Sequence, residues 1–359
     1  TSTARDIKAE VEVSASSGGK GVQASADYGQ TKTTKSEAVA GGIKSGGNLS
    51  LAAGGDANFE GTKVESKGDA SIDAKGSVNF NAARTTEKTE GFSVGASVAA
   101  EKGKSTEGEK TTTEKSGAGG ISGGYNQSNS STAAAGSVQS GGNLKINAGK
   151  NVTAEGTDIA ADGKASVNAK GDVTFKAATS TSDSVDVKAA AGGSSSSSKT
   201  TGGGADEKES SNNARGSAAL SGGQTKSAQA GSIKGGSGLD VNAGGNATFE
   251  GTKVESGGDA NVTAGKDVRF TTADSSNVQG GIAVGGGRAS SSGGEGGNTS
   301  QSAGGGAAGV SGGFQRQGAT VNTAGALNVK SGGQTQMTNT DVKAAGGTNV
   351  DAAGGVKRE

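Results

Sequence analysis

Residues 47–80 read GNLSLAAGGDANFEGTKVESKGDASIDAKGSVNF, and this stretch matches itself when it is shifted by 21 residues. The shift places Leu51 on Ile72 and Phe59 on Phe80, so apolar residues fall on apolar residues. Self-similarity at a period of about 20 to 30 residues is typical of a solenoid, in which each period forms one coil of a continuous stack. The stretch therefore predicts a solenoid whose coils are 21 residues long.

The residues within one period indicate β-structure. Apolar side chains alternate in short runs, as at Leu49, Leu51 and Ala53, which is the pattern of a strand with one buried face. Glycines separate the runs, and glycine accepts the positive φ that a tight corner requires. One period thus reads as three strands joined by three corners. The predicted fold is all-β: a parallel β-helix, right-handed by the usual crossover preference.

A second, longer period of 95 residues relates Leu49, Leu144 and Leu239, and the octapeptide FEGTKVES occurs at both 59–66 and 249–256. Each copy holds about two coils of 21 residues. A fourth copy begins 88 residues after the third, and we expect it to end within a coil at Arg358, before its last aromatic position. The side chains expected to form the structural core ladder inside the coils are Leu49, Leu51, Phe59, Val64, Ile72, Phe80, Leu144, Ile146, Ile159, Val167, Phe175, Leu239, Val241, Phe249, Val254, Val262, Phe270, Leu327, Met337, Val342 and Val350.

Strand-like runs also lie between the coil blocks, in pairs whose connection varies in length. Such pairs predict β-hairpin arms with mobile surface loops at their tips, at 101–115, 193–216 and 287–304. A disordered linker of the same composition is the alternative. The chain is then one continuous β-helical region over residues 1–359, with arms at 1–41, 85–136, 180–231 and 275–318 and coil blocks at 42–84, 137–179, 232–274 and, truncated, 319–359.

Composition and charge exclude several functions. The 35 basic and 35 acidic residues balance, and no basic stripe is interleaved with aromatic residues, so nucleic acid is not expected as a partner. No apolar run approaches the roughly 18 residues that would span a bilayer, so membrane insertion is not expected. The sequence has no His and no Cys, which removes the commonest general base and the usual soft metal ligands. We therefore expect no cofactor and no metal.

Four carboxylates of the first coil block, Asp56, Glu60, Asp69 and Asp73, offer the acid and base pair that a polysaccharide-cleaving β-helix enzyme would need. We interpret them instead as charges at coil corners. Stacked polar side chains can hydrogen-bond to the coil above and below, which we expect for Asn48, Asp69 and Asn143 at matching corners. The sequence thus assigns no catalytic residue.

The pattern Ser-Gly-Gly-Asn-Leu-x-Leu/Ile-x-Ala-Gly, at residues 45–54 and 140–149, is followed by Glu-Gly-Thr. This pattern resembles the haemagglutinin repeats of large bacterial exoproteins, the filamentous haemagglutinins and the contact-dependent growth inhibition effectors of Gram-negative bacteria. The similarity covers nearly the whole chain, including the Ser-Gly-Gly stretches between the coil blocks. It marks the chain as a piece of a longer exoprotein.

The resemblance implies secretion through an outer-membrane transporter of the two-partner route and display at the surface of a Gram-negative bacterium. The implied partner is a receptor, a glycan or the outer membrane of a contacted cell. The expected role is a non-enzymatic, adhesive stalk that serves cell adhesion and virulence. The alternative is the delivery stalk of a contact-dependent growth inhibition toxin, and a more remote one is the carbohydrate-cleaving enzyme.

Overall fold

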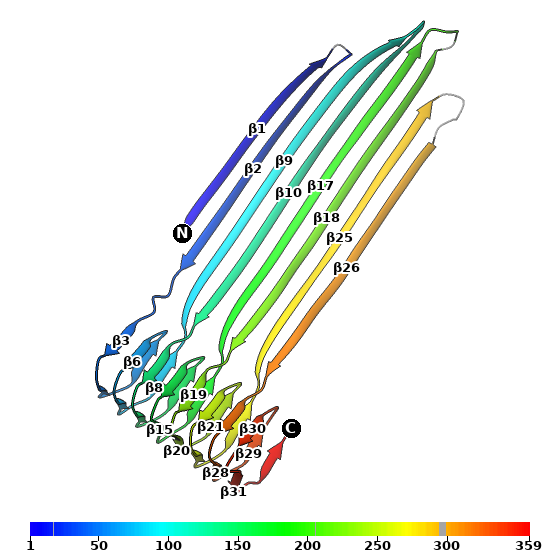
Figure 1. Cartoon of the computed structure of the whole chain (residues 1–359). Coiled ribbons are helices and arrows are strands. Elements are labelled where there is room, and N and C mark those ends of the chain that lie inside the picture. Colours follow the sequence, from blue (N-terminus) through cyan, green and yellow to red (C-terminus); the bar gives the residue numbers. More distant parts are fainter. Residues whose placement is uncertain (17, 205, 294–298) are drawn as a thin grey trace.

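The computed structural model describes all residues except 17, 205 and 294–298, and the regular elements of the described part are all strands. They form four sheets of eight strands each. Three parallel sheets of short strands make up a row of coils, and one antiparallel sheet of long strands extends from that row (Figure 1). The predicted all-β fold, a parallel β-helix with arms between coil blocks, is confirmed.

Each coil contributes one strand to each of three sheets, which together form the coil body. The first coil sheet contains β3 (Gly42–Ser45), β6 (Lys63–Ser66), β11 (Ser137–Ser140), β14 (Asp158–Ala161), β19 (Ser232–Gly235), β22 (Lys253–Ser256), β27 (Thr320–Thr323) and β30 (Asp341–Ala344). The second contains β4 (Leu49–Ala53), β7 (Ala70–Ala74), β12 (Leu144–Ala148), β15 (Lys164–Ala169), β20 (Gly238–Ala243), β23 (Ala260–Ala264), β28 (Leu327–Ser331) and β31 (Thr348–Ala352). The third contains β5 (Ala57–Glu60), β8 (Val78–Asn81), β13 (Val152–Glu155), β16 (Val173–Lys176), β21 (Ala247–Glu250), β24 (Val268–Thr271), β29 (Thr335–Met337) and β32 (Val356–Arg358).

Register turns the sequence period into a stacked core. Ile72 pairs with Leu51 in the preceding coil and with Ile146 in the following one, so like side chains lie directly above one another. Phe249 stacks between Phe175 and Phe270, with ring centroids 5.4 and 4.8 Å apart. Parallel in-register strands thus bury one apolar ladder on each inner face of the coil body.

The predicted ladder residues all lie inside the coil body, but they are not equally buried. Those of the first and last coils are only partly buried, because an end coil has a neighbour on one side alone; they are Leu49, Leu51, Phe59, Val342 and Val350. The others are buried: Val64, Ile72, Phe80, Leu144, Ile146, Ile159, Val167, Phe175, Leu239, Val241, Phe249, Val254, Val262, Phe270, Leu327 and Met337. Further fully buried positions lie outside the predicted ladder, among them Val78, Val138, Val152, Val173, Ile233 and Val268.

The last coil contributes one strand to each coil sheet, so the position at which the sequence predicted a missing aromatic residue lies within the chain. Its strands β30, β31 and β32 each pair with the coil before. Arg358 lies opposite Met337, in the position that aromatic residues occupy in other coils. An aromatic residue is not needed there because the backbone supplies the hydrogen bonds of the ladder.

The long strands form the arm sheet. In chain order these strands are β1 (Ser2–Ser16), β2 (Gly19–Ser36), β9 (Ala83–Glu107), β10 (Lys110–Ala134), β17 (Ala178–Thr201), β18 (Glu207–Gln229), β25 (Ala273–Gly293) and β26 (Thr299–Gln317). Each hairpin pairs with the next as well as within itself; β10 pairs with β17, for example, from Thr111 to Ser131. The predicted arms are therefore not separate hairpins but parts of one sheet.

The spacing of β-strands explains why the arms join. Neighbouring strands are about 4.8 Å apart in any sheet. One repeat adds two coils along the coil body, and its arm adds two strands to the arm sheet. Both therefore advance by about 10 Å per repeat, which brings each arm to hydrogen-bonding distance of the next.

The arm tips are strands, so the prediction of mobile loops and the alternative of a disordered linker are wrong. Residues 101–115 belong to β9 and β10 apart from a turn at 108–109, and residues 193–201 and 207–216 belong to β17 and β18. The predicted tip at 287–304 continues β25 and β26, and its residues 294–298 lie outside the described part, as does residue 205. Because neighbouring arms hydrogen-bond to each other, the Gly and Ser content of the tips does not prevent strand formation.

Candidate contact surface

The first coil of each of the first three blocks turns into the second at a corner with the sequence Glu-Gly-Thr, found at 60–62, 155–157 and 250–252, and the base of the following arm packs against this corner. The glycines Gly61, Gly156 and Gly251 have φ angles of 54°, 58° and 57°. A Cβ added to Gly251 would lie 2.6 Å from the Cβ of Ala273, the first residue of the next arm strand. Glycine is thus needed both for the left-handed backbone and for the close approach of the arm. At the equivalent corner between the last two coils, Asn339, with φ of 46°, takes this conformation, which Asn tolerates better than most residues.

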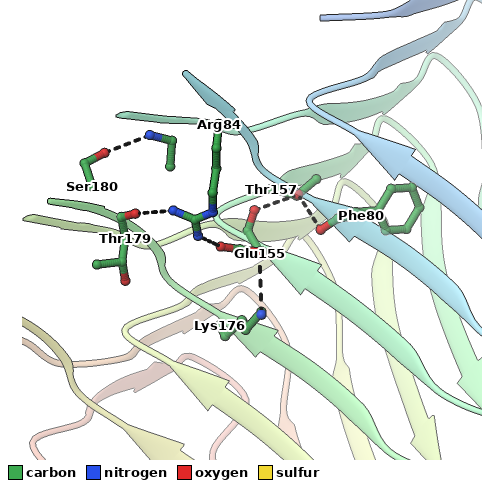
Figure 2. Close-up of polar contacts among 8 residues, drawn as sticks. Phe80, Arg84, Glu155, Thr157, Lys176, Thr179 and Ser180 are labelled. Carbon is green, nitrogen blue, oxygen red and sulfur yellow. Dashed lines mark hydrogen bonds and ion pairs between the residues drawn. The ribbon is translucent and has the colours of Figure 1, made fainter. Parts of the chain in front are cut away.

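An ion pair fixes the base of the first long arm to the coil body (Figure 2). Arg84 lies at the start of β9, and its Nη2 donates to Oε1 of Glu155 at 2.5 Å. The Nη1 atom of Arg84 donates to the carbonyl oxygen of Thr179 in the next arm at 2.6 Å. Lys176 lies 3.5 Å from the other carboxylate oxygen of Glu155, whose side chain is only 10% exposed. One guanidinium therefore connects two arms and one coil.

The equivalent corner of the next repeat lacks this arginine. Glu250 occupies the position of Glu155, and the residues 95 and 190 positions after Arg84 are Thr179 and Asp274. Burial raises the pKa of the Glu250 carboxyl above its usual value, and Asp274 adds to the rise while Lys226 and Lys176 oppose it. The charged form of the half-buried Glu250 carboxylate is therefore in a less favourable environment than that of Glu155, which is paired with Arg84.

The two faces of the arm sheet differ sharply in chemistry. Phe92 pairs with Tyr125, Tyr125 with Val187, and Val187 with Leu220, and directly paired residues share a face. Following the register through all eight strands places every exposed large apolar side chain of the sheet on this one side, here called the apolar face. These side chains are Ile7, Val11, Val13, Val22, Phe92, Val94, Val98, Ile121, Tyr125, Val185, Val187, Leu220, Val278, Ile282, Val284, Val310 and Phe314.

The opposite side, here called the polar face, carries mostly Ser, Gly, Ala and charged residues and is hollowed. A hollow of about 840 Å³ lies across its middle, lined by small residues such as Ser97, Ser122 and Ser217. A second hollow of about 740 Å³ lies nearer the tips, where serines surround the carboxylates of Glu114 and Glu209. The hollows give the polar face hydrogen-bonding groups in a concave shape, which suits a polar ligand.

The carboxylates considered for catalysis lie in coil corners and strands, where most accept hydrogen bonds from the neighbouring coil. Oδ1 of Asp56 accepts from the Ser77 amide at 2.7 Å. The Asp69 amide donates to Oδ1 of Asn48 at 3.0 Å, and Oδ1 of Asp69 accepts from the Asn143 amide at 2.7 Å. The predicted ladder of Asn48 and Asp69 is therefore confirmed. These groups stabilise corners one coil apart.

The remaining two carboxylates also have ordinary surroundings. Asp73 accepts from Asn147 and Ser71, each at 2.5 Å, and these hydrogen bonds hold the pKa of Asp73 below its usual value. Glu60 is exposed at its corner. Among the described residues, no group of three or more acidic, His or Cys side chains is placed to hold a metal ion. The described residues also form no helix able to cross a membrane.

Comparison with known proteins agrees with this architecture. A family model described as hemagglutinin repeat matches residues 1–96, 22–128 and 118–286, which is more than half of the chain. No curated protein and no solved structure matched the sequence. Repeats of this family are structural or adhesive and usually belong to secreted or cell-surface proteins. The chain belongs to the hemagglutinin repeat family.

Proposed function

We propose that the chain is a stalk and adhesive segment of a large secreted bacterial exoprotein, exported by an outer-membrane transporter of the two-partner route. The family match supports a secreted repeat protein, and the division into coil body and arm sheet supports two tasks. The observation that carries the proposal is the arm sheet, which extends from the coil body with both faces open.

The coil body has the properties of a spacer. Its core is one continuous cluster of stacked ladders, so every added coil lengthens the body by about 4.8 Å without changing its cross-section. The carboxylates of its first block are engaged in coil contacts or exposed singly, which supports a non-enzymatic role. A long exoprotein built from such repeats holds its other parts away from the cell that made it.

The arm sheet is the part suited to contact. Its strands of up to 25 residues extend as far as roughly 80 Å from the coil body. The serine hydroxyls and the carboxylates of Glu114 and Glu209 in the polar hollows can hydrogen-bond to a glycan or to polar groups of a receptor. We assign cell contact to this polar face.

Removing the arms while keeping their bases tests the proposal. The register allows all arms to be cut at one row, by deleting 1–31, 91–126, 186–221 and 281–309 and closing each remaining hairpin with Asn-Gly. We expect beads coated with this variant to lose adhesion to cells, while circular dichroism and thermal unfolding still report the coil body. Adhesion equal to that of the intact chain would contradict the proposal.

The identity of the bound cell separates adhesion from toxin delivery. Beads coated with the intact chain are offered to epithelial cells and, separately, to Gram-negative bacteria. Arm-dependent binding to epithelial cells is the result expected of an adhesin. Binding to bacteria alone would contradict the role of an adhesin for epithelial cells. It would favour contact between bacteria, which a delivery stalk requires.

A further inference from the structure

We propose that the apolar face of the arm sheet is the contact surface for a second copy of this chain, packed face to face with it. This inference concerns assembly and does not rest on the proposed adhesive function. An antiparallel sheet normally covers its apolar side with other parts of the fold. Here Ile121 is 66%, Ile282 55% and Phe314 78% exposed, although all three lie on that side.

The middle of the apolar face, in the rows of paired residues from Phe92 to Ala100, carries two charged residues among the described strands, Arg5 on β1 and Arg288 on β25. On β9 it carries residues 92, 94, 96, 98 and 100, which read Phe, Val, Ala, Val and Ala. In the same rows β25 carries residues 282 to 290 at every second position, which read Ile, Val, Gly, Arg and Ser. The adjacent positions on the polar face of β9 are Gly and Ser up to residue 97. A centre with few charged residues, surrounded by a more highly charged rim, is the usual composition of a protein interface.

The area is sufficient for a stable dimer. Eight strands at about 4.8 Å give a width of nearly 40 Å, and these rows, nine residues long on each strand, give a length of about 30 Å. Each copy therefore presents roughly 1,100 Å², whereas a typical stable interface buries about 800 Å² per partner. Two such faces would pack as a sandwich, the ordinary way of covering two one-sided sheets.

Charge at the tips sets the orientation of the two copies. Toward the tips, the apolar face carries basic residues and, among the described strand residues, no acidic ones; they are Arg288, in the row of Val98, and farther out Lys20, Lys102, Lys104, Lys115, Lys199 and Lys208. Two copies with their tips in the same direction would bring these cations together. The base end carries both signs, for example Lys88, Glu90 and Asp183. The copies therefore pack with tips in opposite directions, around a twofold axis.

Sedimentation of the 359-residue chain tests the proposal, with a matched control. The double variant Ile121→Lys, Leu220→Lys places two cations on the apolar face, and Ser122→Lys, Ser221→Lys places them on the adjacent exposed positions of the polar face. We expect a dimer at micromolar concentration for the natural chain and the polar-face variant. The apolar-face variant should associate at least about 100-fold more weakly.

A dye measurement keeps the test valid if the lysine variants fold poorly. The sequence has no Cys, so Ala189→Cys on the apolar face and Ala190→Cys on the polar face give single labelling sites. A polarity-sensitive dye at residue 189 should shift to the blue as the chain is concentrated, and the same dye at 190 should not. End-to-end contact of coil bodies would shift the emission of neither dye.

A natural chain that remains monomeric at micromolar concentration would overturn the proposal. So would equal loss of association in both lysine variants, or equal shifts of both dyes. A monomer whose dye at residue 189 shifts only when phosphatidylglycerol vesicles are added would assign the apolar face to a lipid surface instead.

Discussion

The coil body and the arm sheet use the same alternation of apolar and polar residues, yet only the coil body covers its apolar side. Phe249 in the coil body is fully buried between two other rings, whereas Phe92 in the arm sheet remains 50% exposed. The difference arises because three sheets close around the ladder, while the arm sheet is a single layer. Alternation in the sequence therefore shows that a strand has an apolar side. It does not show which part of the fold covers that side.

Replacing a phenylalanine by alanine should reduce the free energy of unfolding much more in the coil body than in the arm sheet. Phe249→Ala removes a ring that stacks on Phe175 and Phe270, and we expect a loss of about 3–5 kcal/mol of stability from lost burial and the cavity left behind. Phe92→Ala, at a concentration where the chain is monomeric, should change stability by no more than about 0.5 kcal/mol. Urea unfolding followed by circular dichroism measures both. Similar losses would mean that the arm sheet is covered.

Adding a methyl group at the Glu-Gly-Thr corner should reduce stability less than removing a ring from the core does. Gly251→Ala forces a left-handed residue and a 2.6 Å approach to Ala273, so we expect a destabilisation of about 1–3 kcal/mol. Gly305→Ala is the control in the arm sheet, because a Cβ there meets no atom within 4 Å. It should be neutral or slightly stabilising. Equal thermal shifts for the two variants would exclude a special role for the corner.

The ion pair between Arg84 and Glu155 at the arm base should contribute less to stability than the Gly251 corner does. Arg84→Ala leaves the Glu155 carboxylate with only the more distant Lys176 and should cost about 1–2 kcal/mol, since the guanidinium itself is 41% exposed. The conservative variant Arg84→Lys should recover part of this loss. Thermal unfolding of both variants checks the prediction, and no change in either would show that the coil and the arms are held by backbone pairing alone.

The smallest expected effect concerns Glu250 and depends on pH. Its folded pKa is raised above the value of 4.5 that applies in the unfolded chain, so its charged form opposes folding. The penalty is absent below pH 4.5 and complete once the pH exceeds the raised pKa. Glu250→Gln should therefore be more stable than the natural chain at pH 7, and the difference should vanish on acidification.

The coil body could be predicted from sequence because its information is local and repeated. The offset of 21 residues is the register of the strands, as the pairing of Leu51 with Ile72 shows. The burial of Val138 was missed because that strand of four residues, Ser137–Ser140, is too short to show alternation by itself. The repeat of 95 residues that relates Val138 to Ile43 and Ile233 was the signal available for it.

The joining of the arms was not predicted because composition hides it. Segments such as 193–198, which read Gly followed by five Ser, have little strand propensity of their own. They become strands because pairing with Ala118 and its neighbours satisfies their backbone groups. The matching advance of two coils and two strands per repeat was implicit in the sequence, but it becomes visible only when the arm is known to be a hairpin. The ion pair of Arg84 and Glu155, 71 residues apart, depends on that same geometry.

The central claim is that all arms form one continuous sheet, and the distance across that sheet tests it most directly. Ser25 and Ala303 lie in one row of paired residues, six strand spacings apart, so spin labels on Ser25→Cys and Ala303→Cys should be separated by about 29 Å. Labelled chain diluted with unlabelled chain removes distances between copies. Pulsed electron paramagnetic resonance should then give a single narrow distribution near that value. A broad distribution would show that the arms move independently and would contradict the account.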